Sequence, residues 1–291
     1  MLITPDCVPC FFTQTLEILD MCGADQALKR RVMNKVAALV QTLTYDFPPP
    51  KMALKLYTLI AQETGVSDPY KAKKDYANAK ALEIYPQIKS FVAMAPDPLL
   101  AATESSIAGN IIDYGASAHF DIDAEMHKLF GGDFASSHRH EFDFDSFKKD
   151  IADADTIMYL LDNAGEIVFD RVLIELLVSM GKKVTAVVRG GAVINDVTMA
   201  DAEFVGLTKV TEVIDNGIAA PGTLLDLVDA SFLKRFRDAD LIISKGQGNF
   251  ETLESESGPL YFLLKVKCPH VAEGIGARMG SIILRKQKGA V

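Results

Sequence analysis

The chain has 291 residues, of which 49% are hydrophobic and 24% charged, and its formal net charge is −9. This composition is typical of a globular protein with ample material for a core, and it excludes a disordered chain. The acidic balance argues against a nucleic-acid partner, because phosphate backbones need clustered Lys and Arg. At roughly 150 residues per domain, the length predicts about two domains.

The start of the chain, Met1 to Cys7, has neither the basic nor the apolar segment of a signal peptide. No apolar run reaches the ~18 residues that are needed to span a membrane. Four cysteines, Cys7, Cys10, Cys22 and Cys268, are too few for a fold built on disulfides. We therefore expect a cytoplasmic protein with no membrane partner, and the sequence leaves its oligomeric state open.

The first half of the chain shows the spacing of amphipathic helices. Apolar residues recur every three to four positions from Cys10 to Leu19 and from Leu28 to Leu43. The triple proline at 48–50 predicts a break with a short rigid connector, and Pro86 predicts the end or a kink of a helix. Further helices are predicted over 52–64, 68–85, 87–94 and 98–108. The polar stretch 131–145 is typical of a surface loop and marks a predicted domain boundary.

From about residue 150, short apolar runs alternate with helices. Strands are predicted over 156–161, 183–188, 212–214, 241–244, 261–266 and 281–284, and helices over 167–180 and 231–237. This alternation predicts a three-layer α/β/α, Rossmann-like, mostly parallel sheet with an N-terminal all-helical subdomain. We assign 1–145 to a mainly helical subdomain and 146–291 to an α/β/α domain that binds metal and phosphate.

Polar residues follow four of the predicted strands, at the sheet edge where ligands bind in such folds. These segments are Asp162-Asn163-Ala164-Gly165-Glu166, Arg189-Gly190-Gly191 with Asn195-Asp196-Val197-Thr198, Asp215-Asn216-Gly217, and Lys245-Gly246-Gln247-Gly248-Asn249. Each segment taken alone has a structural alternative, because Asp and Asn also cap helices and form turns. Their shared location at strand ends predicts one functional site.

The residue types point to phosphate chemistry at a metal ion. Asp162, Asn163 and Asp196 offer the hard oxygen ligands that suit Mg²⁺ or Mn²⁺. Lys245 and the glycines around it suit an anion, as does the start of the helix near Gly165. Arg189 either binds an anion or pairs with one of the many carboxylates. A metal beside a phosphate supports hydrolysis of a phosphomonoester.

These motifs resemble the signatures of the damage-control phosphatase family, long called a domain of unknown function. The similarity rests on the segments 162–166, 195–198 and 245–250, and the segment Gly109-Asn110-Ile111-Ile112-Asp113 is similar to another family motif. The segment Cys7-Val8-Pro9-Cys10 resembles the start of members of the archaeal and bacterial branch of this family. The resemblance spans residues 7 to about 254. It implies a metal-dependent phosphatase that acts on phosphomonoesters of small metabolites, such as sugar phosphates, nucleotides or damaged phosphorylated cofactors.

The resemblance also implies roles for single residues. The implied metal ligands are Asp162, Asn163 and Asp196, with Mg²⁺ or Mn²⁺ as the metal and Co²⁺ or Ni²⁺ as alternatives. Lys245 would contact phosphate, and the residues placed near the site are Asn110, Asp113 and Glu166. Asp113 and Glu166 are both candidates for the general base, and the predicted substrate-binding residues are Asn110, Arg189, Lys245 and Asn249. Gln247 and Gly248 stand where some relatives have Asp and Leu, so the resemblance does not imply the substrate specificity of those relatives.

Other functions and sites remain open from the sequence. One alternative is a non-catalytic nucleotide- or metabolite-binding module. Another is a Rossmann-type methyltransferase, which needs a Gly-rich loop where the segment 162–166 has one glycine. Cys7 and Cys10 either bind a metal, cycle between redox states or pack as buried thiols, and we favour packing. His138 and His140 are expected on the polar loop.

Overall fold

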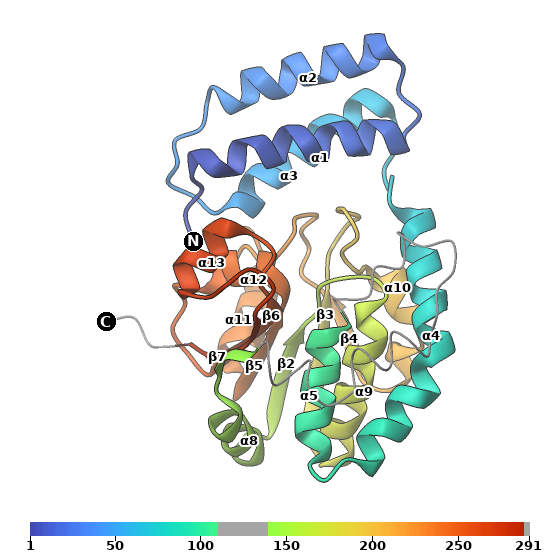
Figure 1. Cartoon of the computed structure of the whole chain (residues 1–291), viewed down its shortest axis with the longest axis vertical. Helices are drawn as coiled ribbons and strands as arrows, with labels where there is room; N and C mark the ends of the chain where they lie inside the picture. Colours follow the sequence, from blue (N-terminus) through green and yellow to red (C-terminus); the bar gives the residue numbers. More distant parts are fainter. Residues whose placement is uncertain (110–138, 288–291) are drawn as a thin grey trace.

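A seven-stranded β-sheet forms the centre of the computed structural model, which describes residues 1–109 and 139–287 (Figure 1). The strand order is β1-β7-β6-β5-β2-β3-β4, and neighbouring strands are parallel except β6 and β7. The strands are β1 (Arg139–Phe142), β2 (Thr156–Leu160), β3 (Lys183–Val188), β4 (Glu212–Asp215), β5 (Leu241–Lys245), β6 (Leu260–Lys265) and β7 (Ile282–Lys286). This confirms the predicted mostly parallel α/β sheet.

The strand order reverses between β2 and β5. From β2 the chain moves outward through β3 to β4, and it then returns to place β5 on the other side of β2. At such a reversal the connections that leave neighbouring strands go to opposite faces of the sheet and open a crevice at the carboxyl ends. The segments after β2 and β5 flank this crevice.

Helices cover both faces of the sheet and give the predicted three layers. Tyr159 and Val188 belong to the core under one set of helices, whereas Met158 and Val187 belong to the core under the other set. The alternation follows from the pleat, because successive side chains of a strand point to opposite faces. The first set is α4 (Lys71–Met94), α5 (Pro98–Ala108), α8 (Phe144–Asp153), α9 (Glu166–Ser179) and α10 (Met199–Phe204). The second set is α11 (Ala230–Asp238), α12 (Gly246–Leu253) and α13 (Pro269–Ile275).

Three N-terminal helices form a bundle of their own. These are α1 (Val8–Met21), α2 (Gln26–Val40) and α3 (Pro49–Thr64), and they share a separate buried core. Figure 1 shows the bundle over the end of the sheet at which β2 and β5 finish. By contrast, α4 and α5 pack on α9 and belong to the core of the sheet. The stretch 1–145 therefore contains two kinds of helix, one set over the strand ends and one set on a face of the sheet.

The prolines at 48–50 occupy a position that the sequence pattern did not predict, whereas Pro86 lies between the two helical stretches that were predicted around it. The triple proline is not a connector between helices, because α3 begins within it, with Pro48 as the N-cap and Pro49 and Pro50 in the first turn. The first N–H groups of a helix have no helical acceptor, so proline costs little there. Pro86 lies inside α4, which continues through it.

The polar stretch 131–145 is not a loop over its described residues, which begin at 139. Arg139–Phe142 forms β1, which pairs with β7 at the sheet edge, and α8 starts at Phe144. A short edge strand with an exposed face lacks the apolar run of a buried strand, so its pattern looks like a loop. His140 is exposed on β1, and His138 lies outside the described residues. In the described part of the chain, no helix has the length and apolar character to cross a membrane.

Candidate active site

The loop after β2 carries the first two predicted metal ligands. Asp162 and Asn163 are 7% and 9% exposed, and α9 starts at Glu166 immediately beyond them. Gly165 turns the chain into the helix with a φ of 79°, a left-handed conformation that favours glycine. The Asp-Asn-Ala-Gly-Glu segment is therefore a strand-to-helix turn at the crevice, as expected.

The loop after β3 brings Asp196 to the same place. Ala164 N donates to Asn195 O at 2.9 Å, and Val197 N donates to Asp162 O at 2.9 Å. These two bonds form an antiparallel bridge between Asn163 and Asp196. Backbone pairing thus brings together the three residues that are predicted to bind metal. The two bridged residues, Asn163 and Asp196, are 33 positions apart in the sequence.

The amide of Asn163 has a fixed orientation. Its Nδ2 donates to Asp162 Oδ2 at 2.6 Å and to Glu166 Oε2 at 3.1 Å. With both N–H groups used in this way, the carbonyl oxygen Oδ1 is the atom left to bind a further group. Within the described part of the chain, Asn163 Oδ1, Asp162 Oδ1 and Asp196 Oδ1 each accept no hydrogen bond.

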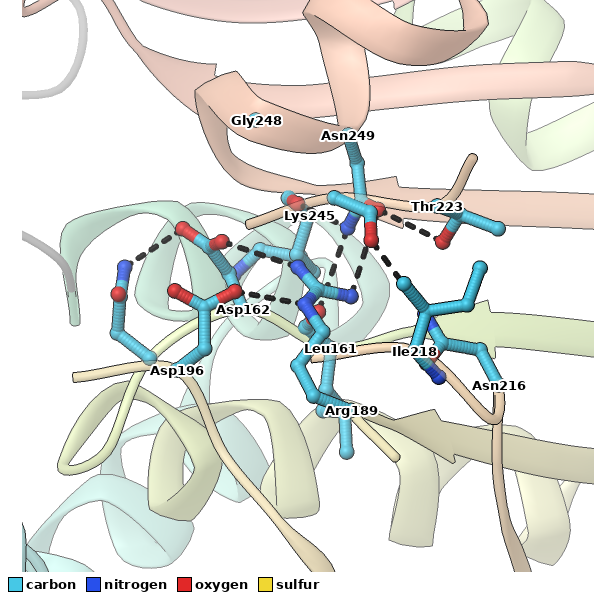
Figure 2. Close-up of polar contacts among 12 residues, drawn as sticks. Leu161, Asp162, Arg189, Asp196, Asn216, Ile218, Thr223, Lys245, Gly248 and Asn249 are labelled. Atoms are coloured by element: carbon cyan, nitrogen blue, oxygen red, sulfur yellow. Dashed lines mark hydrogen bonds and ion pairs between the residues drawn. The ribbon is translucent and has the colours of Figure 1, made fainter. Parts of the chain in front are cut away.

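Arg189, directly after β3, lies between the carboxylates of Asp162 and Asp196 on one side and Asn249 on the other (Figure 2). Nε donates to Asp196 Oδ2 at 2.6 Å, and Nη2 forms an ion pair with Asp162 Oδ1 at 3.5 Å. Nη1 reaches Asn249 Oδ1 at 3.5 Å on the other side. Arg189 is 1% exposed, and its buried Nη2 has no hydrogen-bond acceptor among the described residues. Of the two alternatives for Arg189, pairing with carboxylates thus describes this structure, and Nη2 is the donor that has no hydrogen-bond acceptor.

The site carries an excess of buried negative charge. Burial raises the pKa of Asp162 well above its usual range, and the charges of Asp196 and Glu166 raise it further, against the opposing effect of Arg189. Burial also raises the pKa of Asp196, with Arg189 opposing the shift. Two neighbouring carboxylates that share one guanidinium would be stabilised by an additional cation. The hard oxygen donors of Asp162, Asn163 and Asp196 fit a divalent ion such as Mg²⁺ or Mn²⁺.

This donor set has only two carboxylates. Over residues 1–109 and 139–287, no group of three or more His, Cys, Asp or Glu side chains is arranged to hold a metal ion. The third proposed ligand is an amide oxygen, and Mg²⁺ commonly keeps several waters and substrate oxygens in its coordination shell. The arrangement suits a metal that is bound together with its substrate.

Lys245 is buried in an ion cluster. It is fully buried, and Nζ donates to Ser106 O at 2.7 Å, Glu166 Oε1 at 2.6 Å and Asp170 Oδ1 at 2.7 Å. Burial alone would lower the pKa of Lys245, but Asp170 and Glu166 outweigh burial and raise it. All three N–H groups are used, so a contact with phosphate would require Nζ to release one of these partners.

Asp170 is a site residue that the sequence analysis missed. It lies one helical turn after Glu166, and Oδ1 also accepts hydrogen bonds from Tyr159 Oη at 2.8 Å and Ser106 Oγ at 2.7 Å. Burial, followed by the charge of Glu166, raises the pKa of Asp170 to about 6, against the effect of Lys245. A carboxylate among the apolar residues at the start of α9 was the available signal.

The glycine after Lys245 allows the two central loops to touch. Gly246 has a φ of 80°, and a Cβ built on it would lie 1.9 Å from Asp162 Oδ2. Gly248 approaches the backbone of Pro221, where an added Cβ would lie 2.9 Å from the Pro221 carbonyl oxygen. The Lys-Gly-x-Gly pattern thus permits close packing of loops.

Asn249 connects three loops rather than pointing into open space. Nδ2 donates to Lys245 O at 2.8 Å and to Leu161 O at 3.3 Å, and Oδ1 accepts from Thr223 Oγ1 at 2.9 Å (Figure 2). Its predicted contact with substrate therefore competes with a complete set of internal partners. Asp215 accepts a hydrogen bond from Gly217 N at 2.9 Å, which is the structural alternative for that segment.

Two cavities lie between the N-terminal bundle and the strand-end loops. One has a volume of about 490 Å³ and extends from Tyr57 and Tyr70 to Ile194. The other has a volume of about 370 Å³ and reaches Gln247 and Gly248, next to the site. Asp162, Asn163 and Asp196 line neither cavity. The two cavities therefore lie beside the loops of the proposed metal ligands, between these loops and the bundle, and not at the ligand side chains.

Some predicted residues fall elsewhere. Asn110 and Asp113 lie outside the described residues, so the structure does not place them. Cys7, Cys10 and Cys268 all line the smaller cavity as free thiols, with Cys7 buried and Cys10 exposed. Packing as a buried thiol, which we favoured for the pair, thus describes Cys7 alone.

Comparison with known proteins identifies the family of the chain. A model of the damage-control phosphatase ARMT1-like domain matches residues 3–283. A damage-control phosphatase of Archaeoglobus fulgidus is 31% identical, over 98% of this chain and 99% of the relative, and one of Pyrococcus horikoshii is 31% identical over 99% of both. The crystal structure of a DUF89 family protein from P. horikoshii has a TM-score of 0.91 and 29% identity, over 99% of this chain and 100% of that one. The chain thus belongs to the damage-control phosphatase ARMT1-like family.

Proposed function

We propose that this protein is a metal-dependent phosphatase that hydrolyses phosphomonoesters of small metabolites. The observation that carries the proposal is the set of three oxygens, on Asp162, Asn163 and Asp196, that accept no hydrogen bond from the described residues. They belong to the neighbouring loops after β2 and β3, and the loop after β2 flanks the crevice between β2 and β5, where open α/β sheets bind ligands. The family assignment supports the reaction class.

We assign the divalent cation to Asp162, Asn163 and Asp196. When bound, a divalent ion supplies Lewis-acid polarisation of phosphoryl oxygens and activation of water. Mg²⁺ and Mn²⁺ fit the hard donor set best, with Co²⁺ and Ni²⁺ as alternatives. Glu166 keeps the Asn163 amide turned so that its oxygen is free, because Glu166 Oε2 accepts one of the two N–H bonds.

Other groups of the chain would bind the phosphate and stabilise its developing charge. Arg189 Nη2 is a buried donor that lacks a hydrogen-bond acceptor in the described structure, which supports the predicted contact with substrate. The start of α12 at Gly246 lies against Asp162, so its N–H groups and positive dipole end face the same crevice. Lys245 keeps Glu166 and Asp170 in place and acts as a phosphate ligand only after exchanging a partner.

The choice of general base remains between two carboxylates. Glu166 is engaged through both oxygens, with Lys245 on Oε1 and Asn163 on Oε2. A base must be free to take a proton from water, so these bonds favour a positioning role for Glu166. Asp113 is the other predicted candidate.

The test is release of inorganic phosphate from a panel of sugar phosphates and nucleoside monophosphates with Mg²⁺, Mn²⁺, Co²⁺ or Ni²⁺. We expect turnover that a chelator abolishes, and Asp162→Ala should lose both metal binding and turnover. Asp238→Ala, which removes an exposed carboxylate paired with Lys234, is the matched control and should keep both. Full activity of Asp162→Ala would refute the site. Binding of substrates without turnover would instead support the alternative of a non-catalytic binding module.

A further inference from the structure

Helix α4 places two polar side chains, one turn apart, in the interior of the protein. Lys74 is 3% exposed and Asn78 is 1% exposed. Residues four apart lie on the same face of a helix, so both point toward the same neighbours. Figure 1 shows α4 beside α9 and α10, the helices that follow the loops of the proposed metal ligands. Buried Lys and Asn side chains need specific partners, and these two find them in those loops.

Asn78 holds the loop that carries Asp162 and Asn163. Its Oδ1 accepts a hydrogen bond from Gly165 N at 2.7 Å, across 87 positions of sequence. Gly165 is the left-handed residue that turns this loop into α9. A strong bond to its N–H fixes the turn, and with it the two side chains that immediately precede the turn.

The same amide reaches the loop that carries Asp196. Asn78 Nδ2 donates to Asp201 Oδ1 at 2.9 Å. The other oxygen, Asp201 Oδ2, accepts from Thr198 N at 2.9 Å and from Thr198 Oγ1 at 2.8 Å, which closes the capping box of α10. Thr198 is two residues beyond Asp196, so the capping box fixes the exit of that loop.

Lys74 balances the charge of this arrangement. Nζ lies 3.3 Å from Asp201 Oδ2 and 2.9 Å from Asp68 Oδ2. Asp201 is 5% exposed, and a carboxylate at that depth needs a cationic partner. Buried ion pairs add little net stability compared with apolar packing, so their presence calls for another explanation, such as fixing one geometry.

We propose that Lys74, Asn78 and Asp201, here called the α4 clamp, are positioning residues that set the distance between the Asp162–Asn163 loop and the Asp196 loop. This inference rests on the proposed function, because it assumes that these loops hold a metal ion together. The clamp residues bond to Gly165, to Asp68 and to one another, so they would act through the loops. The clamp fixes two loops through one amide, so loss of the amide should loosen the three ligands relative to one another.

The experiment compares full-length variants by calorimetric Mn²⁺ titration, thermal unfolding and steady-state hydrolysis of one phosphomonoester. Asn78→Leu keeps the volume but removes both hydrogen bonds. We expect its Kd for Mn²⁺ and its kcat at saturating Mn²⁺ to worsen about 10- to 100-fold, with KM within about twofold. Asp201→Asn keeps the shape of the clamp and removes one acceptor of the capping box, so a smaller loss of the same kind is expected.

Tyr85→Phe is the matched control from the same helix. It removes the bond from Tyr85 Oη to Glu175 Oε1, at 2.5 Å, which joins α4 to α9 away from the loops. This variant should keep the Mn²⁺ affinity and kcat of the wild type. If Asn78→Leu does not fold, the folded Asp201→Asn variant decides the question.

The outcomes separate the clamp from the proposed function. A folded Asn78→Leu or Asp201→Asn variant with a Kd and kcat within twofold of the wild type would overturn the clamp alone. An equal loss in Tyr85→Phe would also overturn it, because general loosening of α4 would then explain the effect. A wild type that hydrolyses substrate without binding Mn²⁺, or an Asp162→Ala variant that binds it normally, would refute the metal site itself.

Discussion

The carboxylate of Asp162 lies directly against the Cα of Gly246, so closely that a Cβ at position 246 would be 1.9 Å from Oδ2. This contact joins the loops of the two central strands, β2 and β5, at the point where the strand order reverses. It makes the first proposed metal ligand dependent on a glycine 84 positions later. The glycine is needed for space as well as for its left-handed φ of 80°.

We therefore expect Gly246→Ala to lower kcat by about 100-fold, because a shift of about 1 Å in a ligand costs that much. The matched control is Gly65→Ala. Gly65 has a similar φ of 72°, but nothing lies within 4 Å of its added Cβ. That variant should lose only about 1–2 kcal/mol of stability through strain and keep its kcat. Phosphate release measures kcat and urea unfolding measures the stability of both variants. Equal kcat values for Gly246→Ala and Gly65→Ala would contradict the steric explanation.

The sequence predicted the parts of the site that depend on local pattern. Asp162, Asn163 and Asp196 follow apolar runs of strand length, and parallel strands bring their carboxyl ends to one edge, so these residues were found together. Their bridge, from Ala164 N to Asn195 O, follows from the pairing of β2 with β3. Such features need no knowledge of distant segments.

The rest depends on contacts between distant segments. Asn78 lies in a helix with ordinary amphipathic spacing. Its hydrogen bond with Gly165, which is 87 positions away in the sequence, forms only when α4 packs on α9. Lys245 was expected to face phosphate, but its Nζ donates a hydrogen bond to Asp170, a buried carboxylate on α9. A pattern read along one segment cannot reveal which of several charges will be its partner in the folded protein.

Loss of Lys245 should destabilise the fold itself. Lys245→Met leaves Glu166 and Asp170 buried without their cation, and breaking such a cluster costs about 3–5 kcal/mol. Urea unfolding measures this free energy. The control Lys286→Met breaks a pair with Asp150 in which the Lys side chain is 43% exposed, and it should cost about 0–1 kcal/mol. A Lys245→Met variant of normal stability with a raised KM would instead favour the phosphate-contact role.

Stability should depend on the protonation of Glu251, which lines the smaller cavity. Burial raises the pKa of Glu251 to about 7, with Gln247 and the N-terminal ammonium opposing the shift. In the unfolded chain the pKa of a Glu carboxyl is about 4.3. At a pH between this pKa and that of the folded state, the folded protein holds a proton that the unfolded chain has lost. Wild-type stability should therefore decline relative to Glu251→Gln as the pH rises from about 4 to about 7, and level off above. Urea unfolding of both proteins across this range tests the prediction, and a stability difference that stays constant with pH would contradict the raised pKa of Glu251.

The same cavity should select against a second phosphate on the substrate. It is lined by the carboxyl groups of Asp6, Glu251 and Glu273, of which Glu251 is partly protonated near neutral pH because its pKa is raised to about 7, and no Lys or Arg of the described residues lines it. A second phosphate placed there would meet like charge, so a sugar bisphosphate should have a lower kcat/KM than the matching monophosphate. Glu273→Lys should raise the bisphosphate-to-monophosphate ratio of kcat/KM about fivefold to thirtyfold, as expected for about 1–2 kcal/mol of changed Coulomb energy near water. Glu83→Lys, the same charge change on an exposed face of α4, is the control and should leave the ratio unchanged. An equal rise in both variants would mean that net charge, rather than this cavity, sets the preference.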